Sequence, residues 1–322
     1  MSSRAFAIAA VMLGLRESYH VINRALGASE PLSQMQTLVE YTRSAIAFCM
    51  VVAGFSALRR HPARAEQARR TSPSRWSNPI VAQLASGSAV QDEFCGAVLI
   101  CSWPMPADVV EAYEVFAAKL RQALPAGAYV YPASTLHCTV LTIRAFPAGP
   151  LDAESRKKLA KAWTAVLEAA QKSPGWPTGK FKLRMGRPTL EGAAGIFRYE
   201  DCDGAVAKMR DCLHEAIRDF GGAAVIGGGD KSLGKPIAGF SLPGDPAPHI
   251  PDIVHSTAVR WATEPANRPA ALEAFKEAAA TWCPLEINVK GCKAVFESTP
   301  FMHMPYSNDA SANQHAFWRS DK

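Results

Sequence analysis

Two short apolar runs of this chain, STLHCTVLTI at 134–143 and DIVHSTAVRW at 252–261, interrupt their apolar pattern in the same way. Each has a histidine and a threonine two positions apart: His137 and Thr139 in the first run, His255 and Thr257 in the second. Both runs have the composition of β-strands, in which residues two apart point to the same face. Each run is followed by a helical pattern. The chain therefore predicts two similar α+β lobes, each presenting one His-x-Thr face.

Apolar runs and helical periods interleave only in the later part of the sequence. We expect residues 1–90 to form an N-terminal extension, 91–306 the folded domain and 307–322 a C-terminal tail.

The eight cysteines include no C-x-x-C pair, and most of them lie among apolar residues. This usage predicts buried, reduced thiols in an intracellular protein.

The extension differs from the rest in charge. Residues 1–80 hold ten arginines and four glutamates with no lysine or aspartate, so the remaining 25 basic and 25 acidic residues balance. The folded part is thus not expected to carry a broad phosphate-tracking surface. Three interpretations of the extension stay open: an organelle-targeting segment, membrane attachment through residues 45–60, or an extension without a catalytic role.

Two imidazoles and two hydroxyls suit displacement at phosphorus. Histidine titrates near neutral pH, so one ring can accept a proton from the attacking oxygen while the other donates one to the leaving oxygen. Threonine hydroxyls can bind the non-bridging phosphate oxygens and stabilise the charge that develops on them. This arrangement requires no metal ion and no cofactor, and the sequence has no histidine and cysteine pairs at zinc-ligand spacing.

The stretches TLHCTVLTI and IVHSTAVRW resemble the paired H-x-T/S signature of the 2H phosphoesterase superfamily, which includes 2′-5′ RNA ligase-like proteins and 2′,3′-cyclic nucleotide phosphodiesterases. The stretch GAVLICSWPMPADVVEAYEVFAAKL is similar to the first strand, proline turn and helix of that family. The likeness covers roughly residues 92–304. It implies an α+β, bilobal fold, with two pseudo-symmetric lobes of mainly antiparallel sheet, helices outside and a central cleft.

The resemblance also implies roles for the four residues. His137 and His255 would form the acid/base pair, and Thr139 and Thr257 would bind the phosphate. The implied partner is an RNA end or nucleotide with a cyclic phosphate or a 2′-5′ linkage, and we expect a monomer. Which histidine is the base stays open at this point, as does ligation against hydrolysis.

Two features depart from the family pattern. The histidines are 118 residues apart, farther than in the compact bacterial members, and the segment 221–251 is the expected insertion. Position 258 is alanine instead of a bulky aliphatic residue, which weakens the second motif.

Other interpretations start from the same residues. A binding module of the same fold would hold a nucleotide or RNA end without turnover, although it would not need a matched proton donor and acceptor. A hydrolase built on His255 and Ser256 conflicts with strand geometry, because neighbouring side chains point to opposite faces.

The segment GDKSLGK at 229–235 resembles a phosphate-binding loop, but Pro236 follows where the loop needs Ser or Thr and no helical pattern comes next. Six residues could line the cleft, although each is more simply core or surface: Tyr131, Phe197, Tyr199, Arg144, Arg198 and Arg260.

Overall fold

The strands form two sheets, and each sheet contains one of the two His-x-Thr motifs. The computed structural model describes residues 76–88, 94–242, 244–304 and 316–320, within a compact unit that spans Pro73–Lys322. Residues 1–75 of the N-terminal extension, which include the segment 45–60, and most of the C-terminal tail lie outside the described residues. In the described part of the chain, no helix has the length and apolar character needed to cross a bilayer.

The first sheet has six strands in the order β11-β10-β1-β3-β7-β6. Their bounds are β1 Gly96–Cys101, β3 Cys138–Arg144, β6 Val225–Ile226, β7 His249–Ile250, β10 Cys292–Glu297 and β11 Ala316–Arg319. The second sheet has five strands in the order β2-β8-β5-β4-β9. Their bounds are β2 Ala128–Val130, β4 Phe181–Glu191, β5 Ala194–Asp201, β8 His255–Trp261 and β9 Leu285–Val289. Every strand pair is antiparallel except β6 with β7.

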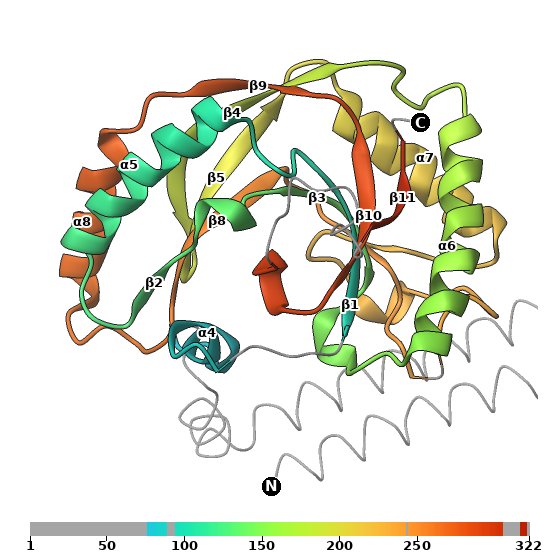
Figure 1. Cartoon of the computed structure of the whole chain (residues 1–322), viewed down its shortest axis with the longest axis horizontal. Coiled ribbons are helices and arrows are strands. Elements are labelled where there is room, and N and C mark those ends of the chain that lie inside the picture. Colours follow the sequence, from blue (N-terminus) through green and yellow to red (C-terminus); the bar gives the residue numbers. More distant parts are fainter. Residues whose placement is uncertain (1–75, 89–93, 243, 305–315, 321–322) are drawn as a thin grey trace, which may run out of the picture. The chain divides into compact units, whose positions relative to one another are not determined.

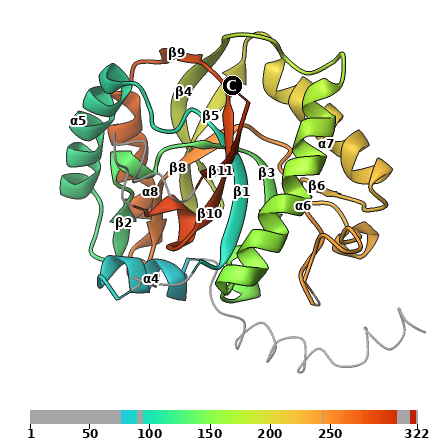
Figure 2. The same ribbon diagram turned by 45° about the vertical axis from the view of Figure 1, so that its right-hand side comes forward.

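Helices cover the outer sides of the sheets. Figure 2 shows α5 and α8 on one flank and α6 and α7 on the other, with the strands between them. The helices have the bounds α4 Pro79–Ala85, α5 Ala107–Ala123, α6 Ala153–Lys172, α7 Ala205–Asp219 and α8 Arg268–Ala280. Short 3₁₀ turns are η1 Ala133–Thr135, η2 Phe146–Ala148, η3 Lys231–Leu233 and η4 Pro300–Met302. The predicted α+β class, with two mainly antiparallel sheets and helices outside, is confirmed.

The helices begin where the sequence supplies caps. The Asp152 carboxylate accepts a hydrogen bond from Ser155 N at 2.7 Å and starts α6, and the Asn267 side chain accepts one from Ala270 N at 3.1 Å and starts α8. Such caps satisfy backbone N–H groups that have no partner within the helix. The buried face of α6 then follows the helical period predicted for it: Leu159, Trp163, Val166, Leu167 and Ala170.

Each sheet combines segments from distant parts of the chain. In the first sheet β1 lies between β3 and β10, which pairs Gly96 with Glu297. In the second sheet β2 pairs with β8, so that Tyr129 lies opposite Arg260. Figure 1 shows β1, a strand from early in the sequence, beside β10, a strand from near its end. The lobes are therefore spatial units and not successive halves of the sequence.

Two elements differ from what their sequence pattern indicates. The segment 293–304 is predicted to be a single strand, but β10 ends at Glu297 and the chain turns into η4. In that turn Phe301 has φ 55° and Met302 has φ 60°, a left-handed backbone that cannot continue a strand. The segment 229–235 forms η3 and no helix follows it before α8, so it is not a phosphate-binding loop of the strand-loop-helix type.

Candidate active site

The two motif histidines lie at the start of their strands and not in the interior. His137 immediately precedes β3, and His255 is the first residue of β8. In the first motif His137 and Thr139 are half-buried, while Leu136, Cys138 and Val140 are buried. In the second motif His255 and Thr257 are half-buried while Ser256 and Ala258 are buried. The alternation of faces is as the sequence predicts, but the histidines sit at strand entrances.

Each motif threonine is followed by a β-bulge. In β3, Thr139 pairs with Ile100 and Leu141 pairs with Leu99, so Val140 has no partner of its own. In β8, Thr257 pairs with Ile196 and Val259 pairs with Gly195, so Ala258 is the extra residue. A bulge adds one residue to a strand and shifts the alternation of its side chains.

The matched bulges have a consequence for the residues after them. The half-buried positions are Thr139 and Thr142 in β3, and His255, Thr257 and Arg260 in β8. Strict alternation would place Arg260 on the opposite face from Thr257, and the bulge restores it to the half-buried set. Alanine at position 258, which departs from the family pattern, occupies the bulge, and its carbonyl oxygen accepts a hydrogen bond from Tyr131 N at 2.8 Å.

Each motif histidine lies near the backbone two residues earlier. His137 Nδ1 lies 2.7 Å from the Thr135 carbonyl oxygen, and the backbone of Ile253 is close enough to the His255 ring to raise its pKa, against the larger effect of burial. A carbonyl oxygen only accepts, so His137 Nδ1 carries the proton and Nε2 of the neutral ring has a free lone pair. The His137 ring is thus held by a hydrogen bond, and the His255 ring has the corresponding backbone beside it.

The two motifs are joined directly. The Ser256 hydroxyl donates a hydrogen bond to the His137 carbonyl oxygen and accepts one from the Tyr199 hydroxyl at 3.0 Å. Ser256 therefore points away from the His255 face and connects β8 to the residue before β3. The prediction that strand geometry excludes a His255 and Ser256 hydrolase agrees with these contacts.

A buried arginine makes a second connection. One guanidinium nitrogen of Arg210, in α7, donates to the Thr139 carbonyl oxygen at 2.9 Å and to the Ile253 carbonyl oxygen at 3.0 Å. It therefore connects the backbone of the first motif to the backbone two residues before His255. Arg210 is not among the residues predicted from the sequence. The sequence does contain a sign of its burial: Arg210 lies on the apolar face of its helix, whose other positions are 206, 213 and 217.

The electrostatic surroundings keep both motif histidines neutral. Burial is the main reason that the pKa of His137 falls to about 4; repulsion from His255 and His303 also lowers it, while the hydrogen bond to Thr135 opposes the shift. Burial also lowers the pKa of His255, with contributions from the nearby charges of Arg260, Arg210 and Arg198. The histidine charges therefore link His137 electrostatically to His255 and to His303. The sequence alone gives His303, which follows η4, no partner.

The other candidates for lining the site separate into different roles. Phe197 is fully buried, and Tyr199 bonds Ser256. Arg144 is buried, pairs with Asp245 at 2.9 Å and donates to backbone carbonyls of the 148–149 turn, so it has a structural role. Arg198 is exposed and pairs with Glu191 at 2.9 Å. The last two candidates lie by η4, with Tyr131 against the ring of His303 and Arg260 against that of Phe301.

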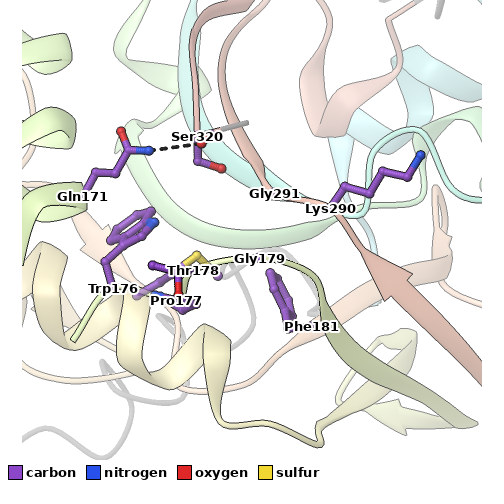
Figure 3. Close-up of a pocket in the computed structure, with 10 residues that line it drawn as sticks. Gln171, Trp176, Pro177, Thr178, Gly179, Phe181, Lys290, Gly291 and Ser320 are labelled. Atoms are coloured by element: carbon purple, nitrogen blue, oxygen red, sulfur yellow. Dashed lines mark hydrogen bonds between the residues drawn. The ribbon is translucent and has the colours of Figure 1, made fainter. Parts of the chain in front are cut away.

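Three pockets formed by described residues lie elsewhere. One, of about 280 Å³, is lined in part by Gln171, Trp176 and Lys290, and Gln171 donates a hydrogen bond to the Ser320 carbonyl oxygen at 3.0 Å (Figure 3). None of the four predicted site residues lines any of these three pockets. No group of three or more potential metal ligands occurs among the described residues.

A buried carboxylate supports the turn that carries His303. Glu297, at the end of β10, accepts a hydrogen bond from Met302 N at 3.1 Å, and burial raises its pKa to about 7. Gly96 faces it across the sheet, and a Cβ at that position would lie 2.6 Å from Glu297 Oε2. The absence of a side chain at Gly96 makes room for the carboxylate.

Replacing this carboxylate should change how stability depends on pH. A carboxyl group whose pKa is higher in the folded state stabilises the protein below its unfolded pKa of 4.5, and this contribution is lost as the pH rises through about 7. We expect Glu297→Gln, which keeps the acceptor for Met302, to raise the free energy of unfolding at pH 8 by up to about 3 kcal/mol. Urea unfolding at pH 4.5 and pH 8 measures this. The two proteins should differ little at pH 4.5, and an equal difference at both values would contradict the assignment; exposed Glu273→Gln is the control.

Comparisons with known proteins found similar folds among solved structures. No family model and no curated protein matches the chain. One similar structure is TT0787 of Thermus thermophilus, with 19% identity, a TM-score of 0.35, and coverage of 62% of this chain and 87% of that one. A second is LigT of E. coli in its apo form, with 15% identity, a TM-score of 0.35, and coverage of 64% and 88%. A third is the PDE domain of MHV ns2, with 9% identity, a TM-score of 0.35, and coverage of 63% and 99%.

Proposed function

We propose that the protein is a phosphoesterase that hydrolyses 2′,3′-cyclic phosphate or 2′-5′ phosphodiester linkages of RNA or nucleotides. His137 and His255 form the acid/base pair, and Thr139 and Thr257 bind the phosphate. The observation that carries this proposal is the duplicated local geometry. In each sheet a histidine at the entrance of a strand is followed by a half-buried threonine and then by a bulge, and the His137 ring is also held by the Thr135 backbone.

We assign His137 as the general base for hydrolysis. Its Nδ1 proton is held by Thr135, its Nε2 lone pair is available, and its low pKa keeps the ring unprotonated at neutral pH. Water gives a proton to His137 as its oxygen attacks phosphorus. His255 gives a proton to the ribose oxygen that leaves, so one P–O bond forms, one breaks, and the product is a phosphate monoester.

The bound phosphate supplies the charge that His255 needs. In the free protein burial and three arginines lower the pKa of His255, which disfavours its protonated form. A phosphodiester anion next to the ring stabilises the imidazolium and raises that pKa. The substrate itself therefore prepares the acid, while the Thr139 and Thr257 hydroxyls donate to the non-bridging oxygens.

The deciding experiment is a product assay on RNA that ends in a 2′,3′-cyclic phosphate. We expect conversion to a single monoester, with a rate unchanged by a chelator such as EDTA, because proton transfer by two histidines needs no metal ion. Chromatographic separation of 2′- and 3′-phosphates identifies the bond that breaks. Tight binding of the RNA end without turnover would instead support the binding module, and activity abolished by the chelator would contradict the two-histidine mechanism.

A further inference from the structure

Three buried polar groups lie around Tyr131 and Phe301 without hydrogen-bond partners among the described residues. They are the hydroxyl of Tyr131, the Nε of Arg260 and the Nε2 of His303, and all three atoms are buried. The rings of Tyr131 and His303 meet edge to face with centroids 4.8 Å apart. The Arg260 guanidinium lies 5.1 Å from the centroid of Phe301. We call these four residues the Phe301 cluster.

The hydrogen-bonding character of each group follows from its surroundings. His303 Nδ1 lies 2.9 Å from the Pro300 carbonyl oxygen, so it carries the proton, and the lowered pKa of His303 leaves Nε2 as an acceptor. Burial raises the pKa of Tyr131, so its hydroxyl keeps its proton and can donate. Arg260 has no ion-pair partner among the described residues and is always a cationic donor. The cluster thus offers one acceptor and two donors.

The cluster is connected to the proposed active site through β8, which carries Arg260 as well as His255 and Thr257. The charge of His303 lowers the pKa of His137, and the charge of Arg260 lowers the pKa of His255. Along β8, Arg260 is three residues from Thr257 with the Ala258 bulge between them, so the two Cα atoms are roughly 7–10 Å apart. That spacing is larger than one phosphate group. The guanidinium therefore suits a second anionic group of the same substrate better than the phosphate that Thr257 would hold.

The turn that carries the cluster is held in an unusual conformation. Phe301 and Met302 both have positive φ, and the Glu297 carboxylate fixes the Met302 N–H. Residues other than glycine adopt this backbone only where surrounding contacts hold them there, and such positions gather at functional sites. Buried polar groups without partners are also uncommon and point to a missing ligand or water.

We propose that Tyr131, Arg260 and His303 form a subsite that binds the penultimate nucleotide of an RNA end. This inference rests on the proposed function and deepens it. Arg260 and the Tyr131 hydroxyl donate to the phosphate that precedes the terminal nucleotide, and His303 Nε2 accepts a hydrogen bond from the 2′-hydroxyl of the penultimate ribose. The natural substrate is then an RNA end and not a mononucleoside cyclic phosphate.

The test compares four substrates: adenosine 2′,3′-cyclic phosphate, the same compound with a 5′-phosphate, the ApA dinucleotide ending in the cyclic phosphate, and that dinucleotide with 2′-deoxyribose at its first position. We expect the 5′-phosphate to raise kcat/KM about tenfold or more, since hydrogen bonds to charged groups stabilise strongly. The deoxy dinucleotide should be several-fold poorer than ApA.

Variants assign these preferences to residues. Arg260→Met should remove the preference for the 5′-phosphate, Tyr131→Phe should reduce it, and His303→Phe should remove the preference for the 2′-hydroxyl. Arg198→Met is the matched control: this arginine lies opposite His255 in β5 but pairs with Glu191, so its loss should leave both ratios unchanged. Tyr131→Phe removes a single oxygen atom, and it keeps the test valid if a larger change prevents folding.

Several outcomes would overturn the subsite. Equal kcat/KM values for the substrates with and without the 5′-phosphate would contradict it. So would an Arg260→Met variant whose kcat/KM falls by the same factor on both of these substrates. If the wild-type protein hydrolyses none of the four, the proposed function fails, and calorimetry with adenosine 2′,5′-bisphosphate and adenosine 2′-phosphate then tests the subsite alone. Tighter binding of the bisphosphate, lost in Arg260→Met, would support it, and equal binding would reject it.

Discussion

His137→Ala and His255→Ala are each expected to lower kcat/KM for a 2′,3′-cyclic phosphate by about 10²- to 10⁴-fold, the usual contribution of a positioned acid or base. Neither change should unfold the protein, because both side chains lie at strand entrances and outside the apolar core. His214→Ala, on the outer helix α7, is the control and should retain activity. Retention of near wild-type activity in either motif variant would remove that histidine from the mechanism.

The pH profile separates the two roles. Because the base must be unprotonated and the acid protonated, we expect kcat/KM of the wild type to be bell-shaped, with its acidic limb near the His137 pKa of about 4. The alkaline limb should lie below 6.5, since the pKa of His255 is lowered from that value in the free protein. The residual activity of His137→Ala should lose the acidic limb, and that of His255→Ala the alkaline one. The reverse pattern would exchange the roles of the two residues.

Arg210→Met is expected to have the second largest effect, on both stability and activity. Its loss leaves the Thr139 and Ile253 carbonyl oxygens without their donor, which should lower the free energy of unfolding by about 2–4 kcal/mol. Because Arg210 connects the two motifs, we also expect kcat/KM to fall on the order of 10²-fold, the cost of a small displacement of reacting groups. Urea unfolding and steady-state kinetics measure the two effects.

A readout beyond stability tests whether Arg210 positions the site. Its charge lowers the pKa of His255, so removing it should move the alkaline limb of the kcat/KM profile to higher pH. Arg210→Lys keeps the charge but not the guanidinium geometry, and should leave that limb in place while lowering the rate. Arg144→Met is the matched control, since this buried arginine pairs with Asp245 and holds the 148–149 turn. It should lose stability without a shift of the limb, and a similar shift in both variants would argue for a general structural effect.

Much of the secondary structure could be predicted because it depends on local pattern. The apolar stripe of α6 and the cap at Asp152 are visible in the sequence, and so is the alternation of His137 and Thr139 with buried neighbours. The predicted strand over 293–304 overlooks Pro300, although proline is disfavoured inside a strand, and β10 ends at Glu297. The turn there depends on a contact from Glu297 to Met302 that no local pattern shows.

The sequence by itself determined the two motifs, the face that each presents and the helices that follow, because side-chain periodicity is a property of a single segment. Only the tertiary structure decided which segments share the site. The bulges after Thr139 and Thr257 depend on pairing with β1 and β5, and they place Arg260 among the half-buried residues. His303 and Arg210 come near the motifs through distant elements. Such contacts depend on how sheets and helices pack, and packing is a property of the whole chain.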